Sequence, residues 1–251
     1  MKKIKFSAEI CYLCAIVILA FSVAMLTASN FGISMIVAPA YLLSLKTGFL
    51  TFGQAEYIIQ AGLFIVLCLA LRKFKFIYVI SFVTCLIYGA VLDLWRLIPF
   101  FNPSVTAPGS MSMAVRIFMF IAGVLLTSFS IALFYKTYLF PQVYDFFVKA
   151  VSMKYGIKIS LFKTIFDLTC LAASLIMTFC FFGKLEGVNF GTVIMALING
   201  TIIGLFSNLV DKIFDICPSF PKFAALFELD SNVKPKISPA EKAQSENEVQ
   251  G

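Results

Sequence analysis

Six apolar runs, each about as long as a membrane-spanning helix, constrain the fold of this chain most. A helix needs about 20 apolar residues to cross the hydrocarbon core of a bilayer. The runs cover residues 8–29, 53–71, 76–98, 114–135, 161–182 and 188–210. Only 13% of the residues are charged, against roughly 25% in ordinary soluble domains. We therefore expect an all-α polytopic membrane protein with about six transmembrane helices in a lipid bilayer.

Two further apolar segments, residues 32–45 and 140–153, are too short to cross a bilayer. Segments of about 10–14 apolar residues are instead typical of re-entrant or interfacial helices. Pro39 lies in the first segment, and Phe140-Pro141 opens the second, which is the chemistry of a turn or a helix start. We expect a short helix in each segment, with the re-entrant and interfacial forms both open.

The lysines and arginines are distributed unevenly over the predicted loops. If the N-terminus is cytoplasmic, all of the 20 basic residues except Lys46, Arg96, Arg116 and Lys184 lie at or near the cytoplasmic side. Membrane proteins keep such positive charge in their cytoplasmic loops. We expect a multi-pass protein of the bacterial inner (plasma) membrane with both termini in the cytoplasm. The bias also explains much of the net charge of +7 without a nucleic-acid partner.

Short matches between the two halves of the chain indicate an internal repeat. FSVA at residues 21–24 returns as FSIA at 129–132, and KTG at 46–48 returns as KYG at 154–156. Both matches have an offset of 108 residues, and the predicted elements follow in the same order. We divide the chain into a first membrane repeat (1–100), an extracellular loop (101–113), a second membrane repeat (114–216) and a cytoplasmic tail (217–251). The last 20 or so residues are expected to be disordered, and residues 220–229 to lie on the membrane surface.

Each predicted half crosses the membrane three times, so the second half must be inverted relative to the first. Inverted repeats are common in secondary transporters, which bind solutes near the midplane where short or broken helices meet. The two short segments occupy corresponding places in the halves, one on each side of the membrane. This arrangement favours a solute site between them, with two purely interfacial helices as the alternative.

Charged side chains inside the apolar runs are the candidate site residues, because each costs roughly 2.5–3.5 kcal/mol to insert. Lys163 and Asp167 lie one helical turn apart on the fifth span, where they can neutralise each other. This pair is either purely structural or part of a solute- or proton-coupled site. Asp145, in the second short segment, belongs to the same cluster if that segment turns inward.

Two further positions complete the candidate substrate-binding set. Glu56 lies just inside the second span, with Gln60 one turn later, and either faces inward or reaches the outer surface. Asn199 lies on the sixth span, beside a small and polar face formed by Gly200, Gly204, Ser207 and Asp211. We interpret this face as a helix-packing surface, with a pore lining as the alternative.

The absence of histidine and of catalytic motifs argues against an enzyme. The chain contains no histidine, the commonest general base and metal ligand. Cys11 and Cys14 form a CxxC, but no second ligand pair lies nearby, so we interpret them as apolar helix residues. We expect no catalytic residues, no metal site and no cofactor.

Several motifs resemble those of the YczE/YyaS/YitT-type family of bacterial integral membrane proteins. They are NFGIS, AP, Y, LS, KTG and TFG in the first half, and FPQVYDFFVKAVSMKYGIKISLFKTIFD and NFGTVIMALINGTIIG in the second. The similarity covers roughly residues 8–210 and includes the Lys163–Asp167 spacing. The resemblance implies a fold and a membrane location rather than an activity. The short tail departs from the YitT branch, which carries a soluble C-terminal domain.

We expect a membrane transporter or channel for a small solute, with its site between the short segments and the fifth span. One alternative is a substrate-binding subunit of a larger uptake complex. In that case the stripe of Ala20, Ala24 and Ala28 on the first span, which we otherwise interpret as a helix-packing surface, would be its docking face. Another is a regulatory membrane protein that transports nothing and recruits a partner through its tail. A homo-oligomer or a partner membrane subunit is compatible with each of these functions.

Overall fold

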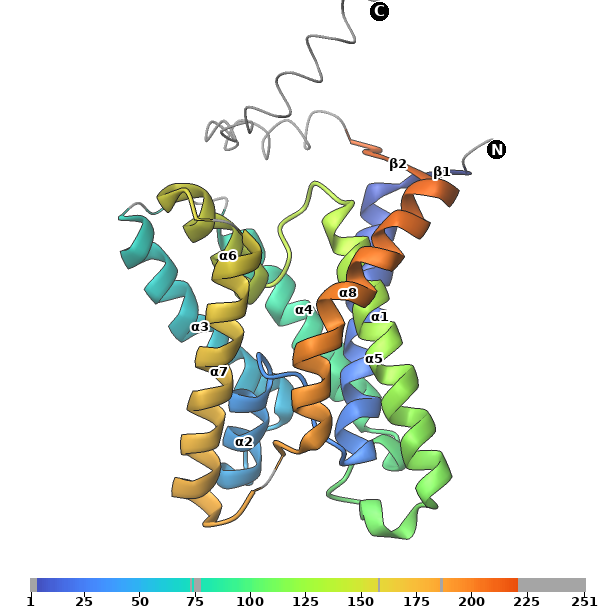
Figure 1. The fold of residues 1–251 in the computed structure, drawn as a ribbon, viewed down its shortest axis with the longest axis vertical. Helices are drawn as coiled ribbons and strands as arrows, with labels where there is room; N and C mark the ends of the chain where they lie inside the picture. Colours follow the sequence, from blue (N-terminus) through green and yellow to red (C-terminus); the bar gives the residue numbers. More distant parts are fainter. Residues whose placement is uncertain (1–3, 73, 75–77, 158, 186, 221–251) are drawn as a thin grey trace, which may run out of the picture.

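The computed structural model describes residues 4–72, 74, 78–157, 159–185 and 187–220 (Figure 1). This part contains eight α-helices. They are α1 (Ala8–Ser29), α2 (Ala38–Thr47), α3 (Phe52–Leu71), α4 (Val79–Arg96), α5 (Met113–Tyr135), α6 (Val143–Tyr155), α7 (Ile159–Phe182) and α8 (Phe190–Ile213). Two short strands, β1 (Ile4–Ser7) and β2 (Phe214–Cys217), and two 3-10 turns, Pro99–Phe101 and Pro108–Ser110, complete it. The segment 220–229, predicted to lie on the membrane surface, and the end predicted to be disordered lie almost wholly outside the described residues.

Six of the described helices are long and apolar enough to cross a membrane, namely α1, α3, α4, α5, α7 and α8. This number confirms the predicted spans and is consistent with a polytopic membrane protein. All predicted boundaries of these spans lie within three residues of the observed ones. α4 begins at Val79, later than predicted, and α8 continues to Ile213, because Lys212 and Asp211 fit the polar end of a helix as well as a loop.

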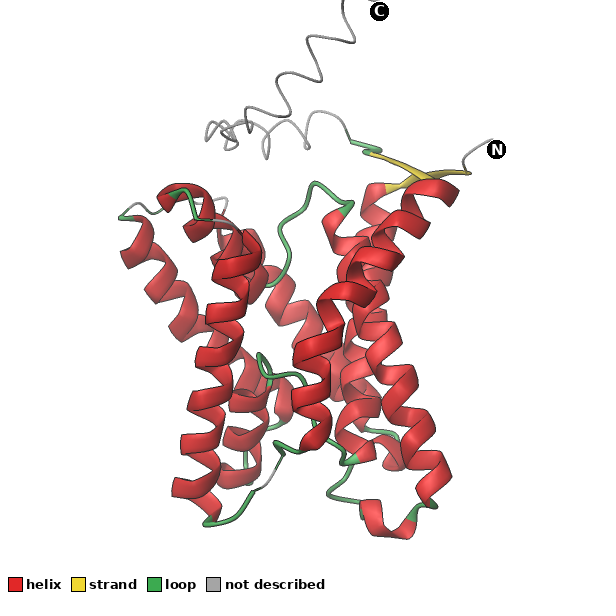
Figure 2. Ribbon diagram, viewed as in Figure 1, coloured by secondary structure: helices red, strands yellow, loops and turns green. Residues whose placement is uncertain are grey.

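The first short helix begins later than predicted. α2 starts at Ala38, and the segment before it is not helical. Gly32 has a φ of 122°, in the region that only glycine adopts easily, and Pro39 at the helix start has no N–H to continue a helix backward. Figure 2 shows this loop, in green, turning back into the bundle before α2 begins.

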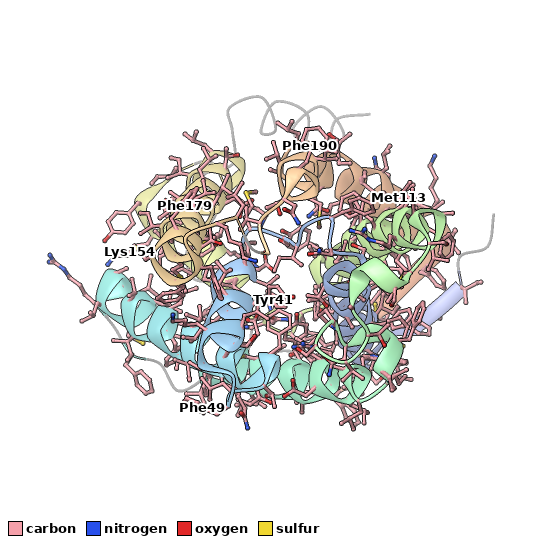
Figure 3. The ribbon with its side chains drawn as sticks, turned by 90° about the horizontal axis from the view of Figure 1, so that it is seen from below. Tyr41, Phe49, Met113, Lys154, Phe179 and Phe190 are labelled. Carbon is pink, nitrogen blue, oxygen red and sulfur yellow. The ribbon has the colours of Figure 1, made fainter. Side chains whose placement is uncertain are left out.

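Both short helices begin inside the bundle and end at its surface. Ala38 and Val143, their first residues, are fully buried, whereas Lys46 and Lys154 near their ends are exposed. In Figure 1, α2 runs from the middle toward one end of the molecule and α6 runs from the middle toward the other. Figure 3, seen along the bundle, places Tyr41 of α2 near the centre and Phe49, just after α2, at the periphery.

α1 and α5 form the centre of the core and run antiparallel (Figure 1). Ser130 on α5 donates to the backbone oxygen of Ala15 at 2.6 Å, and Ser22 and Thr127 share a hydrogen bond at 2.8 Å. The alanine stripe of α1 is fully buried within the chain, at 0% exposure for Ala20, Ala24 and Ala28. The stripe is therefore a packing face, and the alternative of a docking face for a partner is wrong.

The small and polar face of α8 does not pack as predicted. Gly200 and Gly204 are exposed, and no atom lies within 4 Å of a side chain placed at either glycine. α8 packs on α5, but α7 and α8 have little contact in the described residues, unlike α3 and α4. The prediction that this face packs against another helix of the same chain is therefore wrong.

The two ends of the described chain meet at one end of the bundle. β1 and β2 pair in parallel, with Ile4 opposite Phe214 (Figure 1). Glu9, in the first turn of α1, accepts hydrogen bonds from Tyr138 Oη at 2.7 Å and from the N–H of Ser219 at 3.0 Å. The loop before α6 and the segment after α8 are thereby fastened to the start of α1.

Candidate functional site

The loop that leads into α6 is held by hydroxyl groups from two other helices. The hydroxyls of Thr84 on α4 and Tyr12 on α1 lie 3.1 Å and 3.3 Å from the backbone oxygen of Phe140. The two hydroxyls also form a hydrogen bond with each other, so one of them donates to the Phe140 oxygen and the other donates to its neighbour. Buried backbone oxygens need such partners when they lie outside regular structure. These bonds fix the depth at which Pro141 ends the loop and α6 begins.

Gln60 of α3 joins the start of α6 to the rest of the bundle. Its Oε1 accepts a hydrogen bond from the N–H of Val143 at 3.2 Å, and its Nε2 donates to Oε1 of Gln142 at 2.9 Å. Because a backbone N–H can only donate, the orientation of the Gln60 amide is determined. Its Nε2 therefore faces the third partner, Glu56, as a donor at 3.0 Å.

Glu56 is completely buried at the contact of α3, α4 and α6. Its Oε2 accepts hydrogen bonds from Gln60 Nε2 and from the hydroxyl of Tyr144, both at 3.0 Å. Its Oε1 has no hydrogen-bond partner. Glu56 thus faces the interior, and the alternative in which it reaches the outer surface is wrong. The carboxyl is held in the bundle by donors from α3 and α6.

Asp145, one residue after Tyr144, carries the network from α3 to α7. Its Oδ1 lies 3.4 Å from Nζ of Lys163, and Oδ1 of Asp167 lies 3.7 Å from the same ammonium. All three side chains are about one-fifth exposed, at 18–22%. Asp167 Oδ1 is buried and accepts no hydrogen bond. The predicted cluster of Lys163, Asp167 and Asp145 therefore exists, with one cation between two carboxylates.

A cavity of about 290 Å³ lies beside this cluster, at the junction of α5, α6 and their connecting loop. Asp145 lines it, with Lys149 on the next turn of α6. The other lining side chains include Phe134, Tyr135, Leu139 and Pro141. A mainly apolar wall with a few charged groups is typical of a small-molecule site, and the volume is at the lower end for such sites.

Asn199 is the one candidate residue that lies elsewhere. Its Oδ1 accepts a hydrogen bond from Ser128 Oγ at 2.6 Å, across the contact of α8 with α5. Neither α6 nor α7 packs closely on α8 in the described residues. Asn199 therefore belongs to the packing of α5 and α8, whereas Glu56 joins the Lys163 cluster through neighbouring residues of α6.

Three residues near Glu56 were not among the candidates predicted from the sequence, namely Gln142, Tyr144 and Tyr88. Gln142 and Tyr144 flank the first residue of α6, and Gln142 Nε2 is buried without a partner. Tyr88 of α4 is fully buried, and its hydroxyl also has no partner. A polar Gln-Val-Tyr-Asp run directly after Pro141, within an apolar segment, is the signal that points to the first two.

Metal ligands do not gather in the described part of the chain, where no three Cys, Asp or Glu side chains form a group that could hold an ion. A family model described as a family of unknown function, DUF6198, matches residues 6–208. No curated protein and no solved structure matches the chain. The match contains all eight helices except the last turn of α8, and with them the whole candidate site. The resemblance to the YczE/YyaS/YitT-type family stays a prediction.

Proposed function

The chain belongs to the DUF6198 family, whose function is unknown, and we propose that it is a membrane transporter or channel for a small solute. The observation that carries the proposal is the start of α6. This helix begins among buried residues and brings a charged cluster and a polar network together in a bundle of apolar helices. Ionisable groups at such places cost stability and generally serve a pathway or a binding site.

The order and direction of the helices support this function. The sequence long, short, long, long occurs twice, as α1 to α4 and as α5 to α8. We propose that these are inverted repeats and that α2 and α6 are re-entrant helices entering from opposite sides. In transporters of this kind the solute binds where the interrupted helices meet, and one repeat moves against the other.

The solute contacts the cluster of Lys163, Asp145 and Asp167 through Asp145, the cluster residue that lines the cavity beside α6. Lys163 is shared by two carboxylates, and Asp167 Oδ1 accepts no hydrogen bond. The cluster therefore has a free hydrogen-bond acceptor, Asp167 Oδ1, to offer a ligand. A small solute with hydrogen-bond donors and a positive charge, such as a protonated amine, complements it in charge and in size.

A ligand-stabilisation screen of the purified full chain in detergent tests this proposal. The panel contains amines, amino acids, amides, organic acids, nucleosides and inorganic ions, and the melting temperature is measured with each. A ligand at 100 times its dissociation constant stabilises its protein by about 2.7 kcal/mol. We expect a stabilising compound with donor groups, and loss of its effect in Asp167→Asn.

The matched control is Asp211→Asn, which changes an exposed carboxylate on α8 that pairs with Lys136 at 2.6 Å. This variant should respond to the ligand as the wild type does. The stabilising compound is then tested for flux into proteoliposomes. Absence of any stabilising compound, or a compound that binds Asp167→Asn equally well, would overturn the proposed site.

We also propose that the end carrying β1 and β2 faces the bacterial cytoplasm. The support is the excess of lysine and arginine predicted for that side. Cys217 in β2 is exposed and serves as a label in a variant without the other cysteines. A membrane-impermeant thiol reagent added to intact cells should leave Cys217 unlabelled and label Ser110→Cys, between α4 and α5. Labelling of Cys217 from outside would reverse the orientation.

A further inference from the structure

Glu56 has no counter-charge in the described part of the chain. The ion pairs of that part are formed by other carboxylates, and no lysine or arginine described there lies within ion-pair distance of Glu56. The side chain is 0% exposed. A carboxylate buried without a cation is strongly unfavourable, so a positive charge must be supplied by a bound cation or by a proton.

The hydrogen bonds determine which oxygen receives that charge. Oε2 already accepts from Gln60 and from Tyr144, and the Gln60 amide cannot turn over because its Oε1 is held by the Val143 N–H. Both groups therefore act as donors toward Oε2. Oε1 is the atom of this carboxyl without a partner. A proton or a cation therefore binds at Oε1.

The surroundings of Glu56 offer too few oxygen ligands for a metal ion. Hard cations such as Ca²⁺ and Mg²⁺ take about six or more oxygen ligands. Around Glu56, the buried oxygens without a hydrogen-bond partner are Glu56 Oε1 and the hydroxyl of Tyr88. The third group without a partner there, Gln142 Nε2, is a donor. A proton needs one oxygen and leaves the remaining hydrogen bonds unchanged.

We propose that Glu56 is an exchangeable proton-binding site that couples the proposed transport to protons, an inference that rests on the proposed function. The titratable groups facing it are Cys85 and Tyr88 on α4 and Tyr144 on α6. On α2, Tyr41 packs on Phe52, and Lys46 reaches the backbone of Phe181. The proton of Glu56 is therefore the one whose release changes the charge of this buried cluster.

The first turn of α6 provides the link between proton and solute. Tyr144 donates to Glu56, and Asp145, the next residue, pairs with Lys163 beside the cavity. A solute that displaces Asp145 moves Tyr144 away from Glu56 and removes one donor from its carboxyl. Solute binding and proton binding then influence each other by the same factor, as linked equilibria must.

Infrared spectroscopy of the full chain in lipid nanodiscs tests for the proton directly. At neutral pH we expect a carboxylic-acid C=O band that is lost in Glu56→Gln and shifts in D₂O. Tyr144→Phe keeps the carboxyl and removes one donor, so it should shift the band without removing it. Asp211→Asn is the control and should leave the band unchanged. A band that is absent, or unchanged by Glu56→Gln, would overturn the proposal.

Proton entry into proteoliposomes tests whether the proton is exchanged across the membrane. With a potassium diffusion potential, an internal pH dye and the compounds of the solute panel outside, proton entry should be several-fold slower with Glu56→Gln than with wild type. Equal rates would overturn the coupling role. A Glu56 band and Glu56-dependent proton entry without flux of any solute in the panel would instead overturn the proposed solute transport, so the two failures are distinguishable.

Discussion

Gln60 of α3 accepts a hydrogen bond from the backbone N–H of Val143, the first residue of α6, at 3.2 Å. The same side chain donates to Glu56 and to Gln142. One residue therefore satisfies three buried groups and sets the position of α6 relative to α3.

The variant Gln60→Leu should destabilise the protein by at least about 2 kcal/mol, because each buried polar group left without a partner costs roughly 1–3 kcal/mol. Thermal unfolding can be followed with a thiol-reactive dye in a variant that lacks the exposed and half-buried cysteines, since Cys11 and Cys85 are fully buried and react only after unfolding. Gln54→Leu is the matched control on the same helix. Gln54 caps the start of α3 by accepting from Thr51 N–H, and its loss should cost about 1 kcal/mol or less. Equal effects of the two variants would show that Gln60 does not position α6.

Because one ammonium, that of Lys163, is shared by two carboxylates, removing the cation should cost much more stability than removing one carboxylate charge. Lys163→Met leaves two carboxylates without a cation and should destabilise by about 3 kcal/mol, at the low end for a broken buried pair. Asp167→Asn leaves Lys163 and Asp145 as a neutral pair and should change stability by less than about 1 kcal/mol. Chemical or thermal unfolding in detergent measures both.

Lys136→Met is the control for the Lys163 variant, because its partner Asp211 is 55% exposed. Exposed pairs contribute about 0–1 kcal/mol, so this change should be nearly neutral. If Asp167→Asn destabilised the protein as much as Lys163→Met, the cluster would not have an excess of negative charge.

Local patterns in the sequence predicted the spans and one part of the site. The apolar runs of α1 and α5 stand out because lipid and core both exclude polar residues, so their length alone identifies them. Lys163 and Asp167 are four residues apart on one helix, a spacing that brings them together whatever surrounds them.

The remainder of the site depends on contacts between distant residues, which no local pattern contains. Gln60 and Gln142 are 82 residues apart in the chain and meet only because α6 starts against α3. The residues before α2 are apolar enough for a helix, and the prediction of one failed there because Gly32 turns the loop toward α8 instead. Glu56 was ambiguous for the same reason, since its burial is provided by α4 and α6.

Tyr138, in the loop between α5 and α6, predicts a loss of stability at alkaline pH. Burial and the hydrogen bond that its hydroxyl donates to Glu9 raise the pKa of Tyr138 above its ordinary value of 10.0. A raised pKa in the folded state means that the contribution is complete below pH about 10 and is lost as the pH rises through the folded value. Spectrophotometric titration should show that the tyrosine missing in Tyr138→Phe is one of the last to ionise in the wild type.

The same variant should release the loop before α6 from Glu9 while the terminal segments stay bound to it. Tyr138→Phe removes one donor to Glu9, while Ser7 Oγ and the N–H of Ser219 remain. Stability should therefore fall modestly at neutral pH, and the alkaline decline should begin at the same pH or later. Loss of one tyrosine's absorbance change near pH 10 in Tyr138→Phe would instead mean that this hydroxyl ionises as an ordinary exposed tyrosine.

Gly32, the glycine of the loop before α2, should be difficult to replace. Its φ of 122° is strained for any other residue, and a Cβ there would lie 2.6 Å from Thr192 Oγ1 and 2.7 Å from Thr192 N. The neighbouring Phe31 oxygen accepts a hydrogen bond from Gly191 N–H at 2.9 Å, so the loop cannot withdraw without losing its contact with α8.

We expect Gly32→Ala to destabilise the protein by at least about 2 kcal/mol, since backbone strain of this kind alone costs roughly 1–3 kcal/mol. Gly62→Ala is the matched control, because Gly62 lies inside α3 and no atom lies within 4 Å of the position that a Cβ would occupy there. That change should stabilise by about 0.5–1 kcal/mol, as alanine loses less entropy in a helix. Melting temperatures of the two variants in detergent measure both changes in stability. Equal stability of Gly32→Ala and wild type would mean that the loop can leave the start of α8, and that its entry into the bundle does not depend on this glycine.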